Sequence, residues 1–61
     1  MNSKDVINKL KQNGWILVRT KGSHHVFKNS ALGLTVVIPH PRKDLPIGTL
    51  RAIAKQAQIK L

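Results

Sequence analysis

Residues 15–28, with the sequence WILVRTKGSHHVFK, decide the fold of this chain. The first six of them are rich in β-branched and aromatic side chains, which favour a strand over residues 15–20. Lys21, Gly22 and Ser23 supply a turn, because glycine adopts positive φ values at low cost. A second strand follows over residues 24–28, and so short a connection predicts an antiparallel hairpin.

A third strand is predicted over residues 34–38, after a loop at residues 29–33. Pro39 and Pro41 follow it, and prolines cannot continue a hydrogen-bonded ladder. The short connections make the three strands antiparallel neighbours in a meander.

A helix of about ten residues is predicted before the hairpin. Ser3 is the expected N-cap of a helix that begins at Lys4, and Gly14 is the expected stop. The residues expected on its apolar face are Val6, Ile7 and Leu10.

A second helix is predicted after the sheet, with Pro46 near its first turn and its end before Ile59. Its expected apolar stripe consists of Ile47, Leu50, Ile53, Ala54 and Ala57. The fold class is therefore α+β, in the order α-β-β-β-α, with two helices on one face of a three-stranded antiparallel sheet. This is the arrangement of a double-stranded-RNA-binding domain.

Size and composition limit the possible classes of protein. Sixty-one residues, 41% of them hydrophobic, predict one folded domain over residues 1–61. The chain has no cysteine, which excludes disulfides and thiolate metal sites and fits a reducing cytoplasm. We also expect no signal peptide and no membrane-spanning segment, because the apolar runs are short.

The charge is one-sided, with eleven lysines and arginines against Asp5 and Asp44 and a net charge of +9. Such a surface attracts polyanions, so nucleic acid is the favoured partner and an acidic protein the alternative. An anionic membrane is disfavoured, because neither predicted helix combines a basic face with bulky aromatic anchors.

The histidines divide between the faces of the second strand. Phe27, the bulkiest residue of this strand, is expected to pack under the helices. Because side chains alternate along a strand, His25 then lies on the covered side and His24 on the open side. His24 is then either an exposed strand residue or a general base or acid in RNA cleavage. We expect His25 to be structural and His40 to be a rigid-loop residue, with a role in orienting RNA as the alternative for His40.

Two cationic residues lie on the same predicted hairpin. Arg19 and Lys21 are expected within reach of His24, although each alone is more simply a solvated charge. Trp15 is expected in the core rather than stacked on a base. No metal and no cofactor are expected, because the two aspartates are distant and adjacent strand histidines diverge. Serine hydrolase chemistry is disfavoured, because Ser23 has no carboxylate nearby to orient a histidine. The predicted RNA-binding residues are Arg19, Lys21, Ser23, Lys28, Arg42 and Lys43.

The chain resembles the HicA family of toxin ribonucleases from prokaryotic toxin–antitoxin pairs. The likeness rests on Gly14-Trp15, Arg19, Gly22-Ser23-His24 with Phe27, Pro39-His40-Pro41, and residues 45–50, LPIGTL. It implies metal-independent mRNA cleavage, translation inhibition and growth arrest, with the essential histidine at His24. It also implies a HicB-type antitoxin that masks the active site, while we expect the free toxin to be a monomer. One departure is glutamine in the tail, at residues 56–59, where members commonly have glycine.

Two other functions remain open at this stage. A non-catalytic double-stranded-RNA-binding module would place lysines at the start of its last helix, where this chain has residues 46–49, PIGT. A basic protein that only binds an acidic protein would not cleave RNA. Loss of function on replacing His24 distinguishes the nuclease from both.

Overall fold

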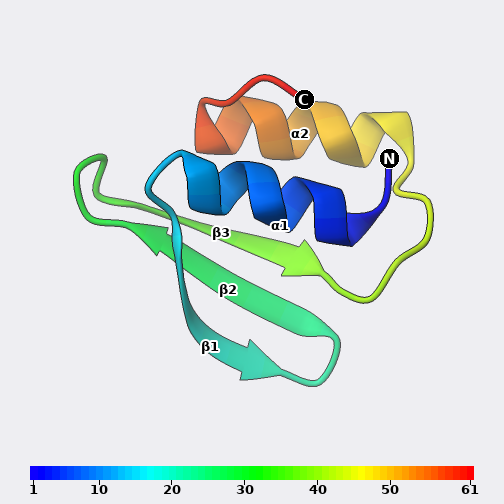
Figure 1. The fold of residues 1–61 in the computed structure, drawn as a ribbon, viewed down its shortest axis with the longest axis horizontal. Coiled ribbons are helices and arrows are strands. Elements are labelled where there is room, and N and C mark those ends of the chain that lie inside the picture. Colours follow the sequence, from blue (N-terminus) through cyan, green and yellow to red (C-terminus); the bar gives the residue numbers. More distant parts are fainter.

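The computed structural model describes all 61 residues and contains two helices and three strands in the predicted order (Figure 1). The elements are α1 (Ser3–Gln12), β1 (Ile16–Lys21), β2 (His24–Asn29), β3 (Leu34–Pro39) and α2 (Ile47–Ala57). The predicted α-β-β-β-α fold is confirmed, with strand bounds displaced by about one residue. Neither helix combines the length and the apolar character needed to cross a membrane.

The sheet is an antiparallel meander in the order β1-β2-β3. Phe27 at the centre of β2 pairs with Leu17 on β1 and Val36 on β3. The register shifts between Leu17 and Arg19, so β1 contains a bulge that increases the local twist. The predicted hairpin and meander are confirmed.

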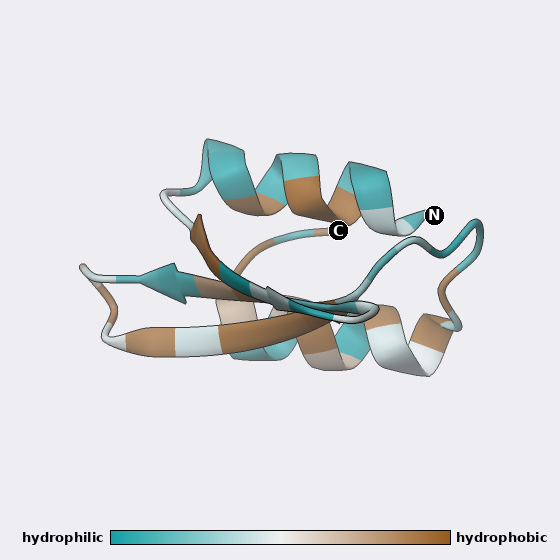
Figure 2. Cartoon of the chain, turned by 90° about the horizontal axis from the view of Figure 1, so that it is seen from below, coloured by the Kyte–Doolittle hydropathy of each residue, from teal (hydrophilic) through white to brown (hydrophobic).

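One hydrophobic core joins both helices to the same face of the sheet. Its residues are Val6, Ile7, Leu10, Trp15, Phe27, Val36, Ile38, Leu45, Ile53 and Ala57. In Figure 1 both helices lie toward the β3 edge of the sheet, with α1 overlapping β3, and in Figure 2 the apolar side of α1 is turned toward the strands. Trp15 is buried, so its predicted place in the core is confirmed.

The start of α1 differs from the sequence-based expectation. Asn2, not Ser3, is the N-cap, and its Oδ1 accepts a hydrogen bond of 2.8 Å from the Asp5 amide. Ser3 is the first residue of the helix and is 1% exposed. The prediction failed because the Ser3 hydroxyl faces inward, where His40 and Arg42 offer partners.

The burial prediction for one residue of α2 is wrong. Ile47 was assigned to the buried stripe of α2 but is 67% exposed, because Leu45, just before the helix, enters the core at this end. Val26 lies on the open face of the sheet, yet it is buried. The helix ends at Ala57, before Ile59, as expected, and Gln58 adopts a left-handed conformation with φ of 56°.

Candidate functional site

The β1–β2 turn presents His24 at one end of the sheet. Gly22 has φ of 57°, which allows β1 to reverse direction within two residues. His24 is the first residue of β2 and is exposed. The turn is held from the side of β3, because the His40 amide donates a hydrogen bond of 2.8 Å to the Ser23 carbonyl.

Cationic side chains share the face that carries His24. Residues paired across antiparallel strands point to the same side of the sheet, and His24 pairs with Lys21. Arg19 pairs with Val26, two residues further along β2, and Lys28 lies two residues beyond that. Arg19, Lys21 and Lys28 are all exposed. The expected grouping of Arg19 and Lys21 with His24 on one face therefore agrees with the register.

No acidic residue lies on the sheet. Asp5 is in the first turn of α1, and Asp44 pairs with the N-terminal amine of Met1 at 3.4 Å. The positive charges around His24 are therefore not neutralised by neighbouring strands, which favours an anionic ligand there. No three His, Asp or Glu side chains gather as a group that could hold a metal ion.

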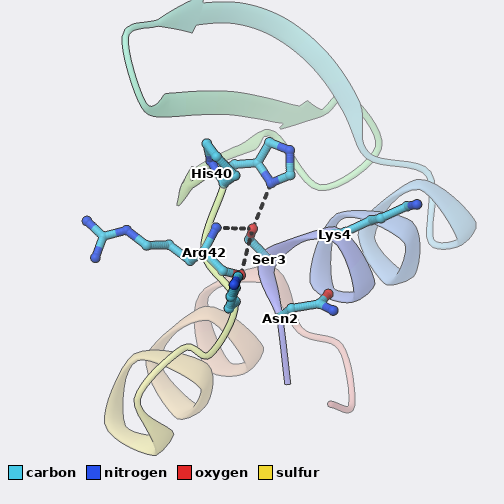
Figure 3. Close-up of a pocket in the computed structure, with 7 residues that line it drawn as sticks. Asn2, Ser3, Lys4, His40 and Arg42 are labelled. Carbon is cyan, nitrogen blue, oxygen red and sulfur yellow. Dashed lines mark hydrogen bonds between the residues drawn. The ribbon is translucent and has the colours of Figure 1, made fainter.

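The remaining predicted cations lie elsewhere. Arg42 and Lys43 belong to the loop between β3 and α2, where they border a depression of about 450 Å³ beside Lys4. In Figure 3 the side chains of Lys4 and Arg42 extend in opposite directions from Ser3. Lys4 and Arg42 therefore do not converge on one point (Figure 3). His24 does not line the depression. Ser23, the last predicted RNA-binding residue, is exposed in the turn.

A cluster on the covered side of the sheet was not found from the sequence. The His25 and His40 rings meet edge to face, with centroids 4.8 Å apart and planes at 82°. His40 Nδ1 lies 2.7 Å from Ser3 Oγ, while His25 Nδ1 is buried without a partner. Strand alternation predicted that His25 is covered, but no local signal links Ser3 to His40, 37 residues away.

Comparisons with known proteins concern the whole chain and its fold. Residues 3–59 match the family model described as "HicA toxin of bacterial toxin-antitoxin". The chain is also similar to a solved structure described as "HicA3 and HicB3 toxin-antitoxin complex", with 34% sequence identity and a TM-score of 0.87. That alignment covers 100% of this chain and 98% of the other. None of the curated protein sequences compared with the chain matches it significantly. The expected resemblance is confirmed, and the chain belongs to the HicA toxin family of toxin–antitoxin systems.

Proposed function

We propose that this protein is the toxin of a type II toxin–antitoxin system and acts as a metal-independent endoribonuclease on mRNA, with His24 as its proton-transfer residue. The observation that carries the proposal is the exposed His24 on the open face of the sheet, with Lys21 paired opposite and Arg19 on the same face. An imidazole exchanges protons near neutral pH, and cations beside it attract the phosphodiester.

The proposed step is an internal transfer within the RNA. His24 takes the proton from a ribose 2′-hydroxyl, whose oxygen then attacks the adjacent phosphorus. The new bond joins O2′ to phosphorus, and the bond from phosphorus to the 5′ oxygen of the next nucleotide breaks. The leaving oxygen takes a proton from the protonated imidazole or from water. The products are a 2′,3′-cyclic phosphate and a 5′-hydroxyl.

Lys21 and Arg19 stabilise the negative charge that develops on the phosphoryl oxygens in this proposal. Lys28 extends the cationic face along β2. Ser23 is exposed in the turn, and its hydroxyl contacts the sugar-phosphate backbone of the RNA in this proposal. Arg42 and Lys43 hold more distant phosphates from the loop after β3.

A HicB-type antitoxin is the proposed protein partner. The similar solved structure is described as a complex of HicA3 with HicB3. A net charge of +9 favours a partner with an acidic surface. In this proposal the free toxin inhibits translation and arrests growth by degrading mRNA, and the antitoxin neutralises it.

Induced expression of the wild type and of His24→Ala tests the proposal, scored by growth and by the integrity of total mRNA. His24 is exposed, so its replacement is expected to leave folding intact. The proposal requires arrest and mRNA degradation by the wild type and neither by His24→Ala. Lys11→Ala, on the exposed side of α1, is the control and should behave as the wild type.

Two results would contradict the proposal. Equal arrest by both proteins would assign His24 a structural role. A folded wild type that binds RNA and leaves it intact would instead indicate a non-catalytic double-stranded-RNA-binding module.

A further inference from the structure

We propose that His40 is a positioning residue for His24, and that Ser3 holds His40 in place. The inference rests on the proposed ribonuclease function, and it concerns residues that lie behind the reactive face rather than on it. His40 connects three parts of the chain: the start of α1, the covered side of β2, and the turn that carries His24.

The backbone of His40 holds the turn directly. His24 is paired with Pro39 at the end of β3, and proline has no amide hydrogen to donate. The next donor in the chain, just after β3, is the His40 amide, which donates to the Ser23 carbonyl at 2.8 Å. The residue immediately before His24 is thereby tied to β3 through His40.

The side chain of His40 is fixed from two directions. Its Nδ1 lies 2.7 Å from Ser3 Oγ, and its ring packs edge to face against His25. Ser3 is itself immobilised, because its hydroxyl accepts a hydrogen bond from the Arg42 amide at 2.8 Å and its own amide donates to the Arg42 carbonyl at 2.9 Å. Figure 3 shows the Ser3 hydroxyl between His40 and Arg42.

These contacts place the His40 ring away from the reaction. His40 contacts His25, which lies on the covered side of β2, whereas His24 lies on the open side. His40 therefore does not transfer a proton in the proposed step. It acts through the Ser23 carbonyl and through His25, which are the two chain neighbours of His24. A displacement of the reacting group by about 1 Å can lower a rate on the order of 100-fold, so such support has a measurable effect.

The first variant is Ser3→Ala, which removes the hydroxyl and leaves the imidazole held only by its packing against His25. We expect the cleavage rate at saturating RNA to fall about 10- to 100-fold, with little change in the RNA concentration that gives half the maximal rate. Ser3→Thr retains the hydroxyl and should restore the rate. His40→Asn, which removes the ring but keeps a polar group near Ser3, should reproduce the loss.

A second measurement needs no cleavage. Hydrogen exchange of the His40 amide reports directly on its bond to the Ser23 carbonyl. In Ser3→Ala we expect this exchange to become about tenfold faster and the NMR signals of the His24 ring to shift, with both restored in Ser3→Thr. Ile53→Val, which removes a buried methyl group in α2, is the control for a general loss of stability.

The outcomes separate this inference from the proposed function. A folded Ser3→Ala protein that cleaves RNA at the wild-type rate would overturn the inference. An equal loss of cleavage rate in Ile53→Val would also overturn it. If the wild type cleaves no RNA, the ribonuclease proposal fails, and the exchange and NMR measurements still decide whether His40 positions His24. If Ser3→Ala changes neither the exchange rate of the His40 amide nor the NMR signals of the His24 ring, the positioning role is overturned.

Discussion

The two faces of β2 carry the same residue type in different surroundings. His24 is exposed on the open face, with Lys21 paired opposite. His25 is half-buried on the covered face, packs against His40, and has a buried Nδ1 without a partner. Strand alternation alone separates the two rings. Adjacency in the sequence is therefore a poor guide to the chemical role of a histidine, whereas the face of the strand is a good one.

The same division applies along the whole strand. Phe27 follows His25 on the covered face and is fully buried, while Lys28 follows His24 on the open face and is exposed. Val26 is the exception, since it is buried on the open face. We therefore expect substitutions on the covered face to change the free energy of unfolding, and those on the open face to change RNA binding or cleavage.

Phe27→Ala gives the largest expected effect on stability. Removing a fully buried aromatic ring should lower the free energy of unfolding by about 3–5 kcal/mol, measured by urea denaturation. Val37→Ala is the matched change on the open face, where the side chain is 47% exposed, and should cost less than about 1 kcal/mol. Similar losses in the two variants would remove the distinction between the faces.

Gln58→Gly changes stability without touching either face of β2. Gln58 is the one non-glycine residue with positive φ, at 56°, and the left-handed conformation costs about 1–2 kcal/mol outside glycine. We expect the free energy of unfolding to rise by about 1 kcal/mol. Gln56→Gly, inside α2, should lower it by about 0.5 kcal/mol. A decrease in both variants would contradict the assignment of strain to Gln58.

His25→Phe examines the covered histidine. Because His25 Nδ1 has no partner, replacing the ring by an apolar one removes an unsatisfied buried atom. We expect the free energy of unfolding to rise by up to about 1 kcal/mol, measured by thermal denaturation, with cleavage retained. Loss of cleavage in a stable His25→Phe protein would contradict the expectation that the His25 ring contributes only packing against His40.

Lys21→Ala gives the smallest expected effect on RNA affinity, beside the slower cleavage that its proposed stabilisation of phosphoryl charge implies. One lost phosphate contact should weaken affinity and reduce the slope of log affinity against log salt by about 1. Fluorescence anisotropy over a series of salt concentrations measures both quantities. Lys11→Ala is the control, because it also removes one positive charge but at an exposed position on α1, away from the sheet. An equal change in both variants would indicate that net charge, not the open face, sets RNA affinity.

Local patterns were sufficient to predict most of the fold and the faces on which His24 and His25 lie. The spacing of Val6, Ile7 and Leu10 identified the buried side of α1, and Phe27 fixed the sides of His24 and His25. These predictions succeeded because helix and strand periodicity depends on backbone geometry over a few residues.

The errors arise where distant segments meet. Ser3 was predicted as a cap from its local sequence, but its hydroxyl bonds to His40 and Arg42, 37 and 39 residues away. Ile47 fits the apolar spacing of α2, yet Leu45 takes the core position at that end. The His25–His40 contact likewise joins a strand to a loop beyond the next strand. The spacing of residues within one element carries no information on contacts between segments that are distant in the sequence.

Single-turnover cleavage of an end-labelled mRNA fragment by purified wild type and His24→Ala tests the central claim most directly. We predict that His24→Ala lowers the cleavage rate about 100- to 10,000-fold, with the thermal unfolding midpoint and the RNA affinity unchanged. The same rate in both proteins would contradict the claim that the open face of β2 carries the reactive histidine.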